Sequence, residues 1–205
     1  MSDHYYTQKP SVKSEKQQLE TTLRGHKMRF NTDSGVFSKT GIDFGSRVLI
    51  EALDLDDAAQ VLDVGCGYGP IGITAAMLAS KGHVTMIDIN ERAIELALEN
   101  AKLNGVSNVS VLQSDLFERV SDLKFDVIIT NPPIRAGKEV VHRIFEDGEK
   151  LLRPGGSMWV VIQKKQGAPS ALAKLESLFA KVEEVTKDKG YRIFRAKKEE
   201  KEKPY

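Results

Sequence analysis

The chain is poor in the residues that form disulfides, bind metals or cross membranes. Its single cysteine, Cys66, excludes an internal disulfide and a metal site built from several cysteines. Its four histidines are scattered and lack the spacing of metal ligands. Apolar runs such as Met158–Ile162 are far shorter than the roughly 20 residues of a membrane helix, and residues 1–10 lack a signal-like apolar centre. We therefore expect a cytoplasmic protein that binds no metal and no membrane.

Neither sign of charge dominates, but the charges are unevenly distributed. The 205 residues carry a net charge of +1. Residues 51–120 hold 4 basic and 11 acidic side chains, whereas residues 1–50 hold 8 and 5 and residues 121–205 hold 18 and 13. An acidic centre between basic ends suits a cationic cofactor and an anionic partner, although solvated termini explain the charge pattern equally well.

From residue 61 onward, short β-branched runs alternate with helical repeats, which is typical of a doubly wound parallel sheet. Strands are expected at 61–64, 84–88, 109–112, 126–130 and 157–162, with a terminal hairpin of 182–186 and 191–196. Helices are expected from Pro70 to about 82, from 91 to 103 behind the cap Asn90, over 138–152, and after Pro169. Residues 153–156 are expected to form a turn.

The first 50 residues differ in character from the rest. Residues 1–22 are polar and are expected to be flexible, and a single domain is expected over 23–200. Within it, residues 23–55 would form an enclosing segment, with a hairpin over 23–37 and a helix over 44–53, and residues 56–200 would form the core.

A glycine loop follows the first expected strand. Gly65, Gly67 and Gly69 allow a ligand to approach the backbone closely, as in nucleotide sites generally. The spacing is G-x-G-x-G with Asp63 just before it, so the dinucleotide fingerprint G-x-G-x-x-G is absent. An acid here would repel a pyrophosphate and attract an ammonium group.

Two further acids lie at the end of the second expected strand and after the third. Asp88 is placed to accept hydrogen bonds from both hydroxyls of a ribose, and Asp115 is placed to accept one from an exocyclic adenine amine. Capping of the next helix by Asp88 and a surface turn at Asp115 are the alternatives.

Asn131-Pro132-Pro133 directly follows the apolar strand 126–130. Two prolines fix the backbone and leave carbonyl groups that no neighbouring N–H can claim. The sequence therefore predicts a clamp for a planar NH₂ group, in which the Asn131 side-chain oxygen and the Pro132 carbonyl each accept one N–H. A simple turn is the alternative.

Together these motifs resemble those of the class I S-adenosylmethionine-dependent methyltransferases, over about residues 44–196. The resemblance implies an α/β, Rossmann-like fold: a seven-stranded, mostly parallel sheet with an antiparallel terminal hairpin and helices on both faces. It implies that S-adenosylmethionine is the cofactor. The implied cofactor contacts are Ser38, Thr40, Asp63, Gly65, Cys66, Gly67, Gly69, Asp88, Ile89, Asp115, Leu116 and Asn131.

Asn-Pro-Pro followed by an aromatic residue is typical of amino-methyltransferases, but here Ile134 follows. A stacking ring would then come from elsewhere, and Phe37 and Phe30 are the candidates. The segment 35–46 resembles that of the small-subunit ribosomal RNA guanine-N2 methyltransferases (RsmC type), which helps to enclose cofactor and base.

This second resemblance implies catalysis by Asn131, Pro132 and Pro133 on a guanine N2 amine, with ribosomal RNA or the small ribosomal subunit as partner. The implied substrate contacts are Phe37, Ile134, Arg135, Lys164 and Lys165, with Lys27 and Arg29 as further phosphate contacts. The enzyme is expected to be a monomer or a homodimer. Methylation of adenine N6 or of a protein glutamine, and RNA binding without catalysis, remain alternatives.

Overall fold

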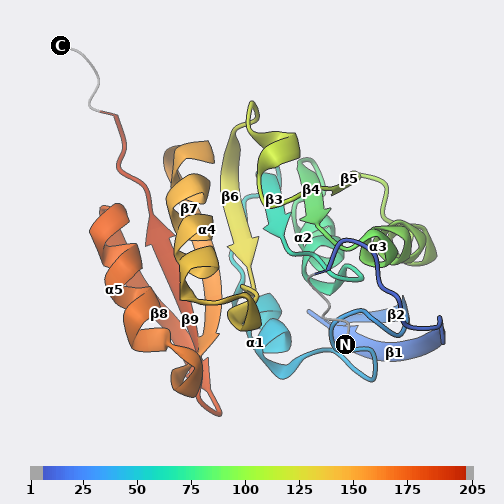
Figure 1. The fold of residues 1–205 in the computed structure, drawn as a ribbon. Helices are drawn as coiled ribbons and strands as arrows, with labels where there is room; N and C mark the ends of the chain where they lie inside the picture. Colours follow the sequence, from blue (N-terminus) through green and yellow to red (C-terminus); the bar gives the residue numbers. More distant parts are fainter. Residues whose placement is uncertain (1–6, 202–205) are drawn as a thin grey trace.

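A computed structural model describes residues 7–201 and contains a seven-stranded sheet (Figure 1). The strand order is β5-β4-β3-β6-β7-β9-β8, and β9 alone runs antiparallel to its neighbours. The expected mostly parallel sheet with an antiparallel terminal hairpin is confirmed. The strands are β3 (Gln60–Val64), β4 (His83–Asp88), β5 (Val109–Gln113), β6 (Phe125–Thr130), β7 (Leu152–Gln163), β8 (Lys181–Asp188) and β9 (Tyr191–Lys197).

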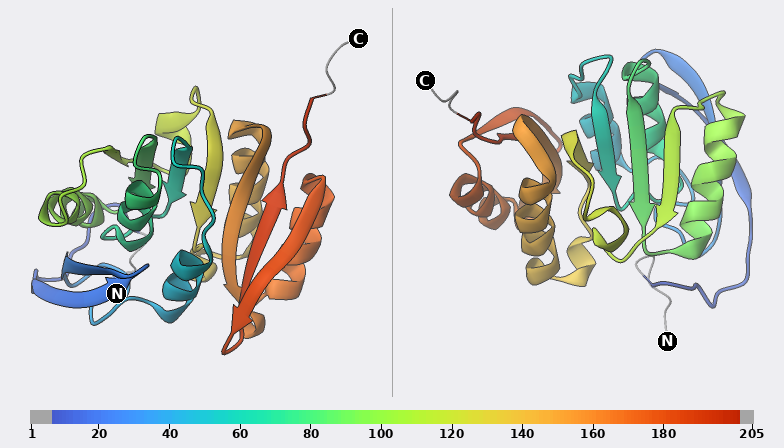
Figure 2. Two further views of the ribbon diagram at one scale, coloured as in Figure 1. Left: turned by 180° about the vertical axis from the view of Figure 1, so that it is seen from behind. Right: turned by 90° about the horizontal axis from the view of Figure 1, so that it is seen from above.

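Helices cover both faces of this sheet (Figure 2). One face packs against α1 (Phe44–Ala52), α2 (Pro70–Leu78) and α3 (Glu91–Leu103), and the other against α4 (Lys138–Leu151) and α5 (Ala168–Leu178). Strand β7 shows how one segment serves two cores, because Trp159 joins the first and Val160 the second. Successive side chains of a strand point to opposite faces, so a strand covered on both sides is apolar throughout.

A two-stranded antiparallel sheet precedes the main one. It consists of β1 (Gln17–Leu23) and β2 (His26–Thr32), joined by Arg24 and Gly25, which both have positive φ. The hairpin therefore lies earlier than the expected 23–37, and residues 17–22, expected to be flexible, form most of β1. Only one face of the hairpin is buried, where β2 packs against α3, so most side chains of β1 are polar. The sequence of β1 therefore lacks the apolar pattern that would indicate a strand. The expected flexibility of residues 1–6 lies outside the described residues, and the remaining domain limits stay a prediction.

Two other expectations are corrected. Helix α2 ends at Leu78 instead of continuing to 82. The expected turn at 153–156 lies inside β7, where the pairing with β6 shifts from Leu152–Phe125 to Ser157–Val127. The glycines of this segment allow the backbone to deviate while the strand continues.

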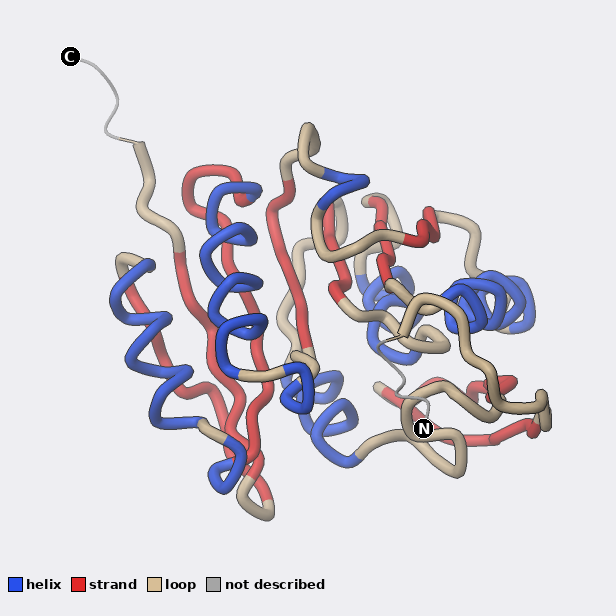
Figure 3. Tube along the Cα trace, viewed as in Figure 1, coloured by secondary structure: helices blue, strands red, loops and turns tan. Residues whose placement is uncertain are grey.

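The loops that follow β3, β4 and β6 meet at one edge of the sheet, beside α1 (Figure 3). Parallel strands bring their carboxyl ends together, and ligands of open α/β sheets bind there. Short 3-10 helices η1 (Glu118–Val120), η2 (Ile134–Ala136) and η3 (Lys164–Gln166) complete the connections. Over residues 7–201, no helix is long and apolar enough to cross a membrane.

Candidate active site

A cavity of about 290 Å³ opens at the carboxyl ends of the strands. The loops after β3, β4, β5 and β6 contribute to its wall, together with the segment before α1 and one face of α4. Of the residues expected at the site, the cavity brings together Phe37, Ser38, Gly65, Cys66, Gly67, Asp88, Ile89, Asp115, Leu116, Asn131, Pro132 and Pro133.

The glycine loop exposes its backbone to this cavity. Gly65 and Gly67 have φ of 73° and 55°, and a Cβ added at either would meet nothing within 4 Å. The amides of Gly65 and Cys66 both donate to the carbonyl of Ile87, 2.9 Å away, which holds the loop against β4. Space above the backbone is therefore available to a ligand.

Gly69, expected to touch the cofactor, lies outside the cavity wall. It has a φ of 106° and precedes α2, where an added Cβ would lie 2.7 Å from Cδ1 of Ile73. Its role is to let the chain turn closely into the helix.

Asp88 lines the cavity in a fixed orientation. Its Oδ2 accepts the amide of Gly67 and its Oδ1 accepts the amide of Asn90, each at 2.9 Å. Asn90, not Asp88, caps α3, because its side chain accepts the amide of Ala93. Burial raises the pKa of Asp88 to about 6 despite these hydrogen bonds. The alternative role of Asp88 as the helix cap is thus excluded, and a carboxylate is held ready for hydroxyl donors.

The opposite part of the wall combines apolar side chains with an exposed acid. Ile89 and Leu116 line the cavity, and Asp115 is exposed beside them. Leu116 has a φ of 49°, and Ser114 supports this strained turn by donating its hydroxyl to the Leu116 carbonyl, 2.8 Å away. Two apolar side chains with a carboxylate at the edge suit a flat heteroaromatic ring that carries an amine.

Asp63, expected to bind the cofactor directly, does not reach the cavity. Its side chain is fully buried and faces the backbone of Gly72 in α2, without a well-aligned hydrogen bond. Burial raises the pKa of Asp63 to about 7, and the charge of Asp88 contributes further. The alternation of β3 explains the correction, because Asp63 points toward α2 whereas the following Val64 lines the cavity.

Asn131 is held from a part of the chain far from it in sequence. Its Nδ2 donates to Oδ2 of Asp43, 3.0 Å away, and to Oγ of Ser46, 2.9 Å away. Both partners belong to the start of α1 and line the cavity. The sequence points to the segment 35–46, which contains both residues, but it gives neither of them a role of its own. The available signal is Asp43, because an aspartate before a helix commonly caps it by accepting the amide three residues later.

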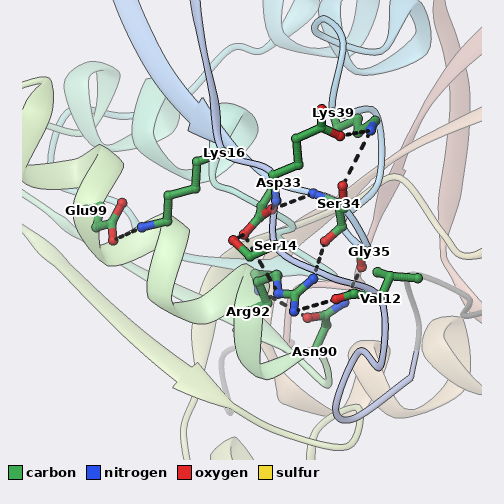
Figure 4. Close-up of polar contacts among 12 residues, drawn as sticks. Val12, Ser14, Lys16, Asp33, Ser34, Gly35, Lys39, Asn90, Arg92 and Glu99 are labelled. Atoms are coloured by element: carbon green, nitrogen blue, oxygen red, sulfur yellow. Dashed lines mark hydrogen bonds and ion pairs between the residues drawn. The ribbon is translucent and has the colours of Figure 1, made fainter.

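The segment before α1 covers one side of the cavity and is held by polar contacts (Figure 4). Arg92 donates to the carbonyls of Ser34 and Val12, and Asn90 donates to the carbonyl of Gly35. These contacts fix the turn that carries Phe37 and Ser38 to the cavity wall.

Tyr68 of the glycine loop also contacts the segment before α1. The hydroxyl of Tyr68 lies 3.2 Å from the carbonyl oxygen of Ser38 and 3.1 Å from that of Gly41, so one donor is shared between two acceptors. Burial raises the pKa of Tyr68 well above its ordinary value, so it stays a donor. Thr40, expected among the cofactor contacts, is exposed outside the cavity wall.

Of the aromatic, apolar and basic residues expected to contact the substrate, only Phe37 lines the cavity within residues 7–201. Phe37 is 39% exposed and lines the cavity, whereas Phe30 is fully buried against the ring of Tyr68. Ile134 lies in η2 and packs against the apolar core, so it is not part of the wall. Arg135, Lys164 and Lys165 are exposed on η2 and η3, outside the cavity.

Helix α4 supplies lining residues that the sequence interpretation missed. Val140, Arg143 and Ile144 face the cavity, with Arg143 at the rim beside Asp147. Residues three and four positions after Val140 lie on the same face of the helix. The sequence predicts this helix, but it does not indicate that one face lines a cavity.

Within residues 7–201, no cluster of three or more histidine, cysteine, aspartate or glutamate side chains could hold a metal ion. The residues present suit S-adenosylmethionine instead. The open space above Gly65 and Gly67 and the oriented acceptors of Asp88 provide room for its amino acid part and partners for its ribose.

The family model described as "Methyltransferase small domain" matches residues 27–195. Among curated proteins, the chain is 55% identical over 200 residues to the "Uncharacterized protein YbxB" of Bacillus subtilis, which covers 97% of this chain and all of that protein. It is 30% identical to the ribosomal RNA small subunit methyltransferase C of Escherichia coli, over 79% of this chain and 47% of that protein. It is 32% identical to the ribosomal RNA large subunit methyltransferase G of Pseudomonas putida, over 80% of this chain and 45% of that protein.

Among solved structures, a 16S rRNA N2 methyltransferase (RsmC) of T. Thermophilus, in complex with AdoMet and guanosine, superposes with a TM-score of 0.80. The two chains are 26% identical, and the match covers 92% of this chain and 52% of the other. The chain thus spans about half the length of the ribosomal RNA methyltransferases that it matches. Fold, cavity and family model agree: the chain belongs to the methyltransferase small domain family, and its cofactor is S-adenosylmethionine.

Proposed function

We propose that this protein transfers the methyl group of S-adenosylmethionine to the exocyclic N2 amine of a guanine in ribosomal RNA, with small-subunit RNA as the substrate. The observation that carries this proposal is the arrangement of Asn131. Both Nδ2 hydrogens are used by Asp43 and Ser46, and Oδ1 accepts no hydrogen bond within residues 7–201. The side chain therefore offers one acceptor at the cavity wall.

Such an acceptor suits an aromatic amine. The Asn131 oxygen and the Pro132 carbonyl would each accept one N–H of the amine and direct its lone pair at the methyl group. S-adenosylmethionine supplies this methyl group on a sulfonium. The amine nitrogen forms a bond to the methyl carbon while the carbon–sulfur bond breaks, and the methylated nitrogen then gives a proton to water. Catalysis rests on positioning and aimed dipoles, so it needs no strong base.

The surface around the cavity supports an RNA substrate. Six cations lie at the edge of the sheet where β6, β7 and β8 end: Arg135, Lys138, Lys164, Lys165, Lys187 and Lys189. None of them forms an ion pair with residues 7–201, whereas cations such as Lys81 and Lys174 on the flanks do. Unpaired cations at one edge are suited to phosphates.

The relatives favour guanine N2 over the other acceptors. A small-subunit enzyme and a structure with guanosine are among the matches. Phe37 lines the cavity wall, and its ring would stack on a base that is flipped out of its helix. Methylation of adenine N6 or of a protein glutamine stays the alternative, because Ile134 departs from the pattern of all amino-methyltransferases alike.

The test is methylation of ribosomal RNA and of small ribosomal subunits from cells that lack this protein, with labelled S-adenosylmethionine and the purified chain. Digestion to nucleosides should yield labelled N2-methylguanosine, and the Asn131→Ala variant should yield almost none. Label in N6-methyladenosine or in protein would reject guanine N2 and leave the methyltransferase assignment intact. A further control is Lys81→Gln, an ion-paired lysine on a flank of the fold, which should behave as wild type.

A further inference from the structure

The orientation of the Asn131 amide depends on one carboxylate outside the Asn-Pro-Pro motif. Oδ2 of Asp43 accepts hydrogen bonds from Nδ2 of Asn131 at 3.0 Å and from the backbone amide of Ser46 at 2.9 Å. The hydroxyl of Ser46 lies 2.9 Å from the same Nδ2. The NH₂ group of Asn131 thus donates both of its hydrogens to side chains at the start of α1.

A carboxylate can only accept hydrogen bonds, so it distinguishes the two ends of an amide. If the amide turned over, Oδ1 of Asn131 would face Oδ2 of Asp43, two acceptors in contact with no hydrogen between them. The hydroxyl of Ser46 could donate to either end and therefore sets no preference by itself. Asp43 is the group that keeps the nitrogen inward and leaves the oxygen for a ligand.

We propose that Asp43 is a positioning residue that holds the Asn131 oxygen toward the acceptor and thereby selects a nitrogen that carries hydrogens as the methyl acceptor. This inference rests on the proposed amino-methyltransferase function. Without Asp43 the amide would present its oxygen or its NH₂ group about equally, and the NH₂ group would face the donor hydrogens of the substrate amine.

Asp43 also caps α1, so the test must separate the two roles. Serine is a good helix cap, but its hydroxyl is one atom shorter and would not reach Asn131, so Asp43→Ser removes the amide contact and keeps the cap. Asparagine can place its oxygen where Oδ2 lies and accept both hydrogen bonds, so Asp43→Asn keeps both. The two variants form a matched pair.

The kinetic arm is a double-mutant cycle on the single-turnover rate at saturating cofactor and RNA. Asp43→Ser should lower the rate by about 10-fold to 100-fold, and Asp43→Asn should restore it to within about fivefold of wild type. In the Asn131→Ala background, Asp43→Ser should cause less than about a twofold further loss, because the residue acts through Asn131. The dissociation constant of S-adenosylmethionine should stay within about threefold in all variants. An equal loss in both backgrounds would overturn the proposal.

A second arm needs no methyl acceptor. In ¹⁵N-labelled protein, the side-chain NH₂ resonances of Asn131 are identified by their disappearance in Asn131→Ala. They should exchange slowly with water in wild type and Asp43→Asn, and at the rate of an exposed amide in Asp43→Ser. Unchanged exchange in Asp43→Ser would refute the positioning role. If this arm succeeds while wild-type protein methylates no RNA, the proposed substrate is wrong and the orientation of the amide stands.

Discussion

Replacement of Asp88 by alanine should weaken the binding of S-adenosylmethionine at least tenfold. The carboxylate is already oriented by the amides of Gly67 and Asn90, and it lines the cavity. A hydrogen bond to a charged acceptor contributes roughly 1.5 to 3 kcal/mol, and a ribose can donate two. Loss of even one such bond corresponds to about a tenfold change in affinity.

Isothermal titration calorimetry measures this effect directly. Asp115→Ala is the matched control, because Asp115 is an exposed acid of the same wall and should cost about two- to fivefold. Urea unfolding of each variant shows whether the fold persists. An unchanged dissociation constant for Asp88→Ala would refute the ribose contact and leave Asp88 with only its two backbone partners.

The same side chain predicts a pH dependence. Burial raises the pKa of Asp88 to about 6, so the carboxyl takes up a proton as the pH falls from 7 to 5 and loses acceptor capacity. Wild-type affinity for the cofactor should therefore fall toward pH 5, by at most about tenfold per unit below the pKa. Asp88→Ala should lack this component, so the difference between the two pH profiles isolates it. Parallel profiles would contradict the assignment.

Three further outcomes are expected. Asn131→Ala should lower turnover by roughly 10² to 10³ while cofactor affinity stays within a few-fold, and a retained single-turnover rate would show that this amide does not hold the amine. Burial raises the pKa of Asp63 to about 7, whereas its pKa in the unfolded chain is near 4. The contribution of Asp63 to the free energy of unfolding is therefore fully present below pH 4 and is lost as the pH rises to 7. Asp63→Asn should therefore gain stability over wild type across that range, by about 4 kcal/mol at most in urea unfolding, and a pH-independent difference would refute this. Arg135→Ala should raise the KM for RNA and reduce the salt slope of binding by about one unit without moving the methylated position, and an altered position would show base contact instead.

The regular core could be predicted because its signals are local. The strand β4 and the helix α3 with its cap Asn90 follow from apolar periodicity and one side-chain hydrogen bond. The hairpin of β1 and β2 could not be recognised in this way. Its strands bury one face only where they meet α3, through contacts such as the reciprocal hydrogen bonds of Asn31 and Asn100.

The sequence by itself determined the order of the elements, the glycine loop and the position of the Asn-Pro-Pro motif after its strand, because these depend on spacing and on backbone chemistry within a few residues. Only the tertiary structure decided which acids serve the cavity. Asp63 precedes the loop and is turned away by the alternation of its strand, whereas Asp43 lies 88 residues from Asn131 and still accepts its amide hydrogen. A pattern in the chain identifies a carboxylate, but the packing of one element on another determines the direction in which that carboxylate points.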